Sequence, residues 1–236
     1  MARKYSSGCS IANDLYLTQE RSGWDWGPCP RSYMTYKNDR ITNISAIEFS
    51  KAFERIQSKN ILPSVRWTST QILLRTLWTR VKEANTSRQD PTQIETSCSN
   101  CGTMPEHTIH LVYECPLAME LWRIVFDSFN NRIPALFHVR DAFPVQLTSD
   151  CILFHHTNNN LPIKARHELN EIIVIVKHVL YRFKFRENID RYPSIRLATI
   201  TVALELEKLT AVRRYRCEWI AGLVAITQDL KTIVGF

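Results

Sequence analysis

The amino-acid sequence predicts an all-α protein. Apolar residues recur at steps of three and four in most segments, which is the period of a helix with one buried face. The chain has 236 residues, of which 44% are hydrophobic and 22% are charged, and this ordinary globular composition can supply a buried core. Prolines and polar runs separate the periodic segments. We therefore expect an irregular helical fold of one or two domains.

The N-terminal segment, residues 1–45, is predicted to be irregular and rich in aromatic residues. Two glycines and two prolines in "SGWDWGPCPRSYMTYKNDR" interrupt any helical period. Aromatic side chains in such a segment can cover the edge of a core or stack on nucleic-acid bases, and the first use is the commoner one. These side chains are Trp24, Trp26, Tyr33 and Tyr36.

Residues 46–130 are expected to form helices around a cysteine-rich segment. The apolar period predicts one helix over residues 45–60, ahead of a proline, and a second over residues 68–84. The polar run 85–97 contains a proline and no period, so we expect a linker there. On the second helix three basic residues fall on the solvent side, namely Arg75, Arg80 and Lys82.

The cysteine-rich segment, residues 98–115, has the spacing Cys98-x2-Cys101-x8-His110-x4-Cys115. Three thiolates and one imidazole form a closed tetrahedral set that suits Zn²⁺. A catalytic zinc keeps one position open for water, so this pattern predicts one structural zinc ion in a small CCHC knuckle. His107 is the alternative fourth ligand, and helix direction favours His110 over it.

The local structure of the knuckle also follows from its residue types. Gly102 supplies the permissive backbone that a tight turn after two cysteines needs. Thr103 and Glu106 have the spacing of a capping box, which predicts that a short helix starts there and carries His110. Pro116 is predicted to end that helix close to the last cysteine.

The next helix is predicted to follow directly, in "PLAMELWRIVFDSF". Trp122 lies on its apolar face, so we expect this side chain to pack the knuckle onto the helical body rather than to stack on a base. Residues 131–163 are expected to be an irregular linker. The neighbouring His155 and His156 of this linker lie in a polar, Asn-rich run, where we expect them to point into solvent without a role.

Residues 164–236 are predicted to be a C-terminal helical region containing a pair of helices, over 164–187 and 194–218. The first is expected to expose Lys177, Lys184 and Arg186. The second ends in a basic run, which the helix dipole favours and which could also contact phosphates. This run contains Arg213, Arg214 and Arg216.

Charge and targeting signals restrict the setting of the protein. The net charge of +7 is compatible with a nucleic-acid partner. The sequence shows no signal peptide and no apolar run of membrane-spanning length, so we expect a protein of the nucleus or cytoplasm that is neither secreted nor membrane-bound. Seven cysteines in a reducing compartment do not suggest disulfides.

The cysteine-rich segment resembles the zinc-binding segment that follows the reverse transcriptase domain in non-LTR, LINE-type retrotransposon polyproteins. The resemblance rests on Cys-x2-Cys-Gly, on Glu106 and His110-Leu111, on Cys115-Pro116 and on Leu121-Trp122, and it covers about residues 65–130. The family's Cys, Cys, His and Cys correspond to Cys98, Cys101, His110 and Cys115.

The resemblance implies that the chain binds RNA or DNA, with a reverse transcriptase domain encoded upstream as a possible partner. The polymerase motif Tyr/Phe-x-Asp-Asp and the expected nuclease pairs are absent, so we expect no enzymatic activity. The alternative is a zinc-fastened scaffold module that binds another protein. The residues predicted to contact nucleic acid are Arg75, Arg80, Lys82, Lys184, Arg186, Arg213, Arg214 and Arg216.

Overall fold

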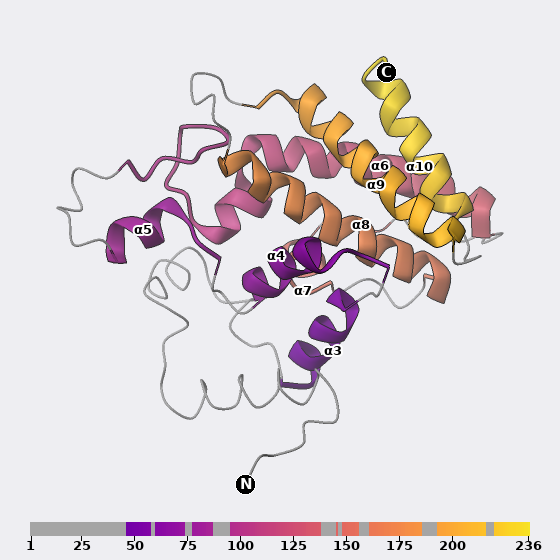
Figure 1. Cartoon of the computed structure of the whole chain (residues 1–236), viewed down its shortest axis with the longest axis horizontal. Coiled ribbons are helices and arrows are strands. Elements are labelled where there is room, and N and C mark those ends of the chain that lie inside the picture. The colour runs from indigo at the N-terminus through magenta and orange to yellow at the C-terminus, as the bar shows by residue number, and fades with distance from the viewer. Residues whose placement is uncertain are drawn as a thin grey trace, which may run out of the picture.

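The computed structural model describes residues 46–57, 60–73, 77–86, 95–137, 145, 148–155, 161–185, 193–215 and 220–236. The aromatic segment 1–45 lies outside this part of the chain. The described residues are mostly helical and contain no strand, which confirms the all-α prediction. In chain order the elements are α3 (Ala46–Ile56), α4 (Pro63–Leu73), α5 (Arg80–Thr86), the π-helix η2 (His110–Glu114), α6 (Pro116–Phe137), α7 (Ser149–Phe154), α8 (Ile163–Arg182), the 3-10 helix η3 (Phe183–Phe185), α9 (Ile195–Tyr215) and α10 (Ala221–Ile233) (Figure 1).

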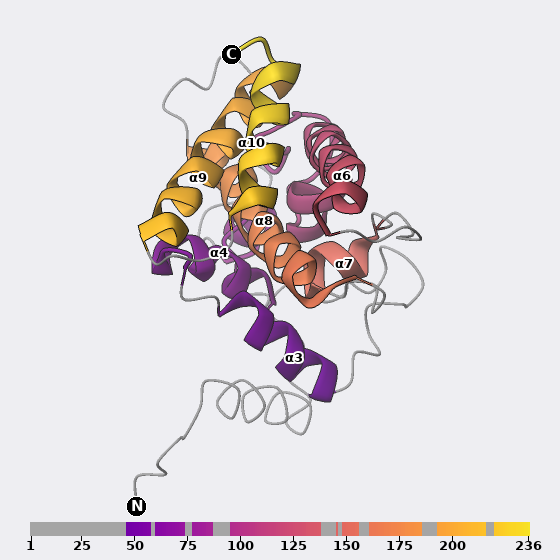
Figure 2. The same cartoon turned by 90° about the vertical axis from the view of Figure 1, so that its right-hand side faces the viewer.

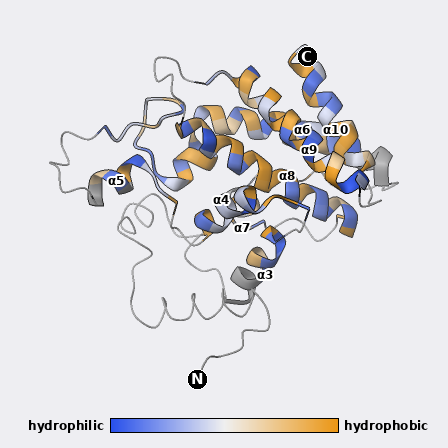
Figure 3. Cartoon of the chain, viewed as in Figure 1, coloured by the Kyte–Doolittle hydropathy of each residue, from blue (hydrophilic) through white to orange (hydrophobic). Residues whose placement is uncertain are grey.

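Helix α8 forms the centre of the molecule. Residues 172–176 are all buried, so apolar side chains cover its whole circumference, and such a helix is stable only when other elements surround it. Helix α4 packs on one side of α8, and α9 and α10 pack on the other (Figures 1 and 2). Apolar residues likewise line α6 and α8 in Figure 3. No described helix combines the length and the apolar character needed to cross a membrane.

The single helix predicted over residues 68–84 is wrong in its continuity. Helices α4 and α5 are separate, and residues 77–79 between them are not helical. Pro63 is the first residue of α4, a position at which a helix does not need the missing N–H. Leu77 and Thr79 are both buried in the break, so the chain leaves the helical path to place them against the core.

The C-terminal region holds three described α-helices instead of the predicted pair. Helices α8 and α9 agree with the expected ranges 164–187 and 194–218, but α10 was not predicted, and it packs against α9 and α6. Gly222 in its first turn lowers the helix propensity of this segment. The linker predicted over 131–163 is also partly helical, because α6 continues to Phe137 and α7 forms within it.

Lys177 and His155 were expected in solvent, and both are completely buried. The Lys177 Nζ lies 3.1 Å from His155 Nε2 and donates to the Leu153 carbonyl at 3.3 Å. Arg55 donates to the carbonyl of His155 at 3.0 Å. Burial lowers the pKa of Lys177 to about 7. These polar groups therefore join α3, α7 and α8 inside the core, whereas His156 lies outside the described residues.

Candidate metal centre

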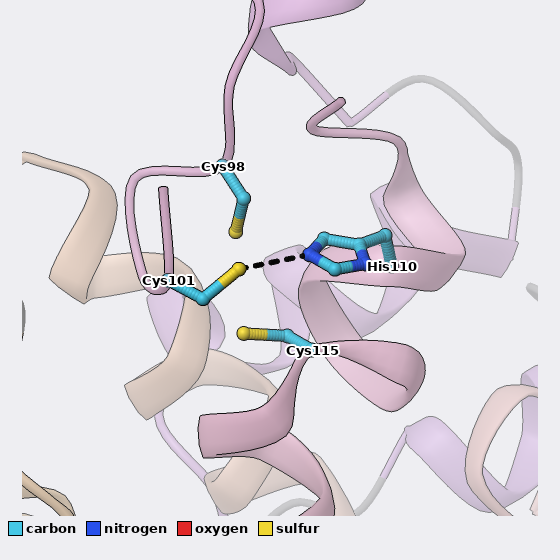
Figure 4. A group of neighbouring side chains, drawn as sticks. All are labelled: Cys98, Cys101, His110 and Cys115. Carbon is cyan, nitrogen blue, oxygen red and sulfur yellow. Dashed lines mark hydrogen bonds between the residues drawn. The ribbon is translucent and has the colours of Figure 1, made fainter. Parts of the chain in front are cut away.

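Four side chains of the cysteine-rich segment converge on one point (Figure 4). The Sγ atoms of Cys98, Cys101 and Cys115 and a ring nitrogen of His110 all lie within 4.8 Å of one another. The His110 Nε2 atom lies 3.3 Å from Cys101 Sγ. A tetrahedral ion with bonds of about 2.3 Å needs ligand atoms about 3.8 Å apart. The group could therefore hold a metal ion, as its spacing predicts.

A tight turn places the first two of these side chains together. The Cys98 N–H donates to the Met104 carbonyl at 2.8 Å, and the Gly102 N–H donates back to the Cys98 carbonyl at 2.7 Å. Gly102 has a φ of +69°, in the left-handed region that favours glycine. The glycine after Cys101 is thus required by the turn that aims both thiols at one point.

A π turn, η2, positions the other two side chains. The N–H of Cys115 donates to the His110 carbonyl at 2.7 Å, across the five-residue step that defines a π-helix. In an α-helix five residues rotate by about 500°, so His110 and Cys115 would point about 140° apart. The wider turn brings both onto the same face. The four-residue gap between them is therefore accommodated by a π turn, which the sequence did not predict.

The capping box predicted at residues 103–106 does not form. Residues 104–106 pair with residues 96–98 in antiparallel fashion, so their backbone is extended and the helix begins only at residue 108. Thr103 Oγ1 instead lies 3.2 Å from Cys101 Sγ, where its hydroxyl stabilises the thiolate. The prediction was wrong because pairing within the knuckle competes with helix formation.

Glu106 ties the knuckle to two other parts of the chain. Its fully buried carboxylate accepts from the N–H groups of Ser99 and of Arg80, the first residue of α5, both at 3.0 Å. The Lys184 ammonium lies 3.0 Å away. Burial opposes ionisation, but the Ser99 hydrogen bonds and the Lys184 charge outweigh it and hold the pKa of Glu106 below its usual range. Sequence patterns could not identify this partnership, because the partners are distant in the chain.

The three thiols of the group hold their protons unequally. A hydrogen bond to Cys115 and burial raise the pKa of Cys98 to about 12. The same hydrogen bond lowers the pKa of Cys115, and N–H groups of Ala118 and Leu117 at the start of α6 lower it further. Burial disfavours the His110 imidazolium, but hydrogen bonds to two thiols raise its pKa to about 9. A divalent cation must therefore displace protons as it binds.

Two side chains fix the knuckle to the helical body. Trp122 is completely buried, and its Nε1 donates to the Val112 carbonyl of the π turn at 2.7 Å. Asn100 donates from its side chain to the Leu180 carbonyl of α8 at 3.2 Å, and from its backbone to Cys98 Sγ at 3.4 Å. The prediction that Trp122 packs the knuckle onto the body is confirmed, whereas Asn100 was not identified from the sequence.

His107, the alternative ligand, is not a member of the converging group. Its N–H donates to the Pro105 carbonyl, and its own carbonyl accepts from the Leu111 N–H, both at 2.9 Å. Burial and the neighbouring His110 lower the pKa of its half-buried ring. His107 thus lies where the extended chain enters the helix.

The basic residues predicted to contact nucleic acid occupy different environments. Arg80 donates to the Ser97 carbonyl at 2.9 Å, and Lys184 pairs with Glu106. Arg213 is buried and pairs with Glu171 at 2.5 Å, while Arg214 is exposed. The structure thus gives three of these cations internal partners. Three of the other predicted contacts lie outside the described residues, namely Arg75, Arg186 and Arg216. Lys82 belongs to α5, but its side chain is not among those that the structure describes.

The chain matches no protein-family model, no curated protein and no solved structure. The four converging ligands and the helical body that holds them are therefore the features from which a function can be argued.

Proposed function

We propose that this chain binds one structural zinc ion and uses the helical body fastened by that ion to bind RNA or DNA. The observation that supports zinc is the ligand set, in which three thiolates and one imidazole converge within 4.8 Å. Soft thiolates with one imidazole select zinc over magnesium, calcium or manganese. Four protein ligands complete its tetrahedron, so the ion holds the knuckle together without activating water.

Native mass spectrometry of protein purified under reducing conditions tests the metal. We expect one zinc ion per chain, and we expect Cys98→Ser to lose it because a hydroxyl is a much weaker ligand than a thiolate. Cys151→Ser is the matched control, since Cys151 is equally buried but lies outside the group. Replacing His110 with alanine should also lose the ion, whereas His107→Ala should keep it. Stoichiometric zinc in Cys98→Ser would contradict the assignment.

The nucleic-acid part of the proposal is supported by the net charge of +7 and by the resemblance of residues 65–130 to the retrotransposon segment. Exposed cations on the described surface include Arg214 and Arg182, the latter with a side chain 57% exposed. Lys and Arg side chains that neutralise phosphates release counterions, so such binding weakens steeply with salt. A chain of this kind would act together with a reverse transcriptase domain encoded upstream.

Electrophoretic mobility shifts with RNA and DNA at about 50 and 200 mM salt test this part of the proposal. We expect binding that weakens by about tenfold or more over that range, as counterion release requires for several phosphate contacts. Arg214→Gln should weaken binding to all sequences alike. No shift with any nucleic acid at the lower salt would overturn the proposal while leaving the zinc assignment intact.

One observation favours the alternative, a zinc-fastened module that binds another protein. Arg80, Lys184 and Arg213 all have internal partners, so these three cations contribute less to an open basic surface than their sequence positions suggest. Zinc binding without nucleic-acid binding in the two experiments above is the result that this alternative expects.

A further inference from the structure

Two segments far apart in the sequence interleave aromatic and basic residues. The first is "RTLWTRVK", residues 75–82, and the second is "YRFKFR", residues 181–186. Within the described residues, the first contributes Trp78 and the second contributes Tyr181 and Phe185. Neither segment belongs to the four-ligand group, so the metal site alone does not account for them.

The fold brings these two segments into contact. The Lys184 Nζ donates to the Trp78 carbonyl at 3.0 Å, and the Trp78 backbone hydrogen-bonds the Tyr181 hydroxyl. The rings of Tyr181 and Phe185 meet edge to face, with centroids 5.1 Å apart at 88°. The same Lys184 ammonium lies 5.9 Å from the Phe185 centroid. The Trp78 backbone is therefore bound to the end of α8 that carries the Tyr181–Phe185 ring pair, and we call Trp78, Tyr181 and Phe185 together the aromatic platform.

Two residues of the aromatic platform are open to solvent, whereas Tyr181 is partly buried against the core. Phe185 is 61% exposed and Trp78 is 41% exposed, so neither ring is used to fill the core. The support beneath them is buried, because the Lys184 side chain is 8% exposed and is held by Glu106 of the knuckle. Asn100 of the knuckle also holds the α8 end, through the Leu180 carbonyl. The exposed rings are thus positioned in advance, which reduces the entropy lost when a ligand binds.

The chemistry of the aromatic platform selects its ligand. Exposed aromatic rings beside cations suit a ligand that offers flat π faces and negative charge together, and unpaired bases on a phosphate backbone offer both. Arg182, next to Tyr181 in the chain, is 57% exposed, and Arg80, two residues after Trp78, is 21% exposed. Both arginines also pair with carboxylates, so the rings rather than the cations supply the distinctive contact.

We propose that the aromatic platform of Trp78, Tyr181 and Phe185 is a stacking site for the unpaired bases of single-stranded RNA or DNA. This inference rests on the proposed nucleic-acid function and adds the class of ligand, single strands in preference to duplexes. Bases inside a duplex are already stacked on one another and cannot lie on these rings, so duplex binding does not use the platform. The zinc knuckle serves the site indirectly, by holding Lys184 and the end of α8.

Fluorescence anisotropy with labelled single-stranded RNA and DNA and with the matching duplexes tests the inference. Trp78→Ala and Phe185→Ala should each weaken single-strand binding by about 5-fold to 150-fold, the range for losing one base-stacking ring. Duplex binding should change by less than about twofold. Trp78→Phe and Phe185→Tyr keep a ring and should recover most of the affinity, which separates stacking from a defect in folding.

Phe236→Ala is the matched control. Phe236 is 67% exposed and has Lys231 at 5.5 Å from its ring, but it lies at the C-terminus, away from the end of α8 (Figure 1). This variant should bind single strands as the unchanged protein does. The slope of affinity against salt should also stay unchanged in Trp78→Ala, because a ring releases no counterions.

Three results would count against the inference in distinguishable ways. If the unchanged protein binds no nucleic acid at low salt, the proposed function fails and the stacking site fails with it. If single strands bind but both alanine variants bind them within about twofold of the unchanged protein, only the stacking site is overturned. Equal losses for single strands and duplexes in the alanine variants would likewise overturn it, because removing a ring that stacks only on unpaired bases should not weaken duplex binding.

Discussion

At the scale of single residues, Glu106 joins three parts of the chain through one buried carboxylate. Glu106→Ala would leave Lys184 and the Arg80 N–H without their buried acceptor, so we expect the free energy of unfolding to fall by about 3–5 kcal/mol. Urea denaturation measures this change. Glu95→Gln is the control, because Glu95 is 69% exposed and its pair with Arg80 should contribute less than about 1 kcal/mol. Equal losses in the two variants would contradict the role given to Glu106.

Glu168 and Glu171 flank the same buried arginine but lie at different distances from it. Glu171 lies 2.5 Å from Arg213, whereas Glu168 lies 3.8 Å from it and accepts no hydrogen bond from any described residue. Burial raises the pKa of Glu168 to about 7; the Glu171 charge also raises it, and Arg213 opposes the increase. Because the folded state binds the Glu168 proton more tightly than the unfolded state does, this carboxyl group contributes stability that is fully present below pH 4.5, its ordinary pKa. That stability is lost as the pH rises to about 7.

We therefore expect Glu168→Gln to gain stability relative to the unchanged protein as the pH rises. The gain between pH 4.5 and pH 8 should be about 1–3 kcal/mol, because the amide never has to ionise inside the core. Glu171→Gln is the matched variant and should lose stability at both pH values, since it removes the charge that faces Arg213. Urea denaturation across this range measures both. A Glu168→Gln gain that does not depend on pH would contradict the assigned protonation.

At the scale of elements, the close contact of α10 with α8 depends on Gly222. A Cβ atom at this position would lie 2.0 Å from Glu168 Oε2, closer than any real contact. We expect Gly222→Ala to lower the free energy of unfolding by about 1–3 kcal/mol, as other overpacked positions do. The double variant Gly222→Ala/Glu168→Ala should cost less than the sum of the two single changes, because the obstructing carboxylate is absent. Additive losses in this cycle would show that the clash lies elsewhere.

The local pattern of apolar residues determines which elements the sequence could predict. The period of α3, α6 and α9 is visible in the sequence because each of these helices buries one face, whereas α8 stands out by the continuous apolar run 172–176. Helix α10 buries one face with Leu223, Ile226 and Leu230, so its period was present, but Gly222, which allows the close approach to Glu168, weakens the local helix signal. The break before α5 could not be predicted, because the distant Glu106 supplies the acceptor at its first N–H. These two positions are set by tertiary contacts, which have no local period.

The candidate site also has features that the sequence could predict and features that it could not. The four ligands could be chosen from cysteine spacing and residue chemistry, because a metal restricts which side chains can meet. The π turn, the Thr103 hydroxyl on Cys101 and the Glu106 partners could not, since each depends on the folded backbone of the knuckle or on residues distant in the chain. Local capping rules predicted a helix at residues 103–106, and antiparallel pairing within the knuckle prevailed there.

At the scale of the whole molecule, the candidate metal site lies at one edge of a body that has its own core. Helix α8, whose residues 172–176 are buried, packs against α3, α4, α6, α9 and α10 as well as against η2, so the knuckle supplies only part of its cover. We therefore expect zinc removal by a chelator to open the knuckle and leave the body folded. Hydrogen exchange followed by mass spectrometry should show faster exchange at residues 96–115 and unchanged protection at 172–176. Equal loss of protection in both segments would mean that the metal supports the entire fold.

The π turn also limits how the length of this chain can change among relatives. One residue added or removed between His110 and Cys115 would turn the cysteine by about 100° around the helix and carry it away from the other ligands. The exposed tip of the knuckle, residues 103–105, lies outside any helix and can lengthen without turning a ligand. Insertions and deletions should therefore accumulate between the second cysteine and the histidine, and the four-residue interval after the histidine should keep its length.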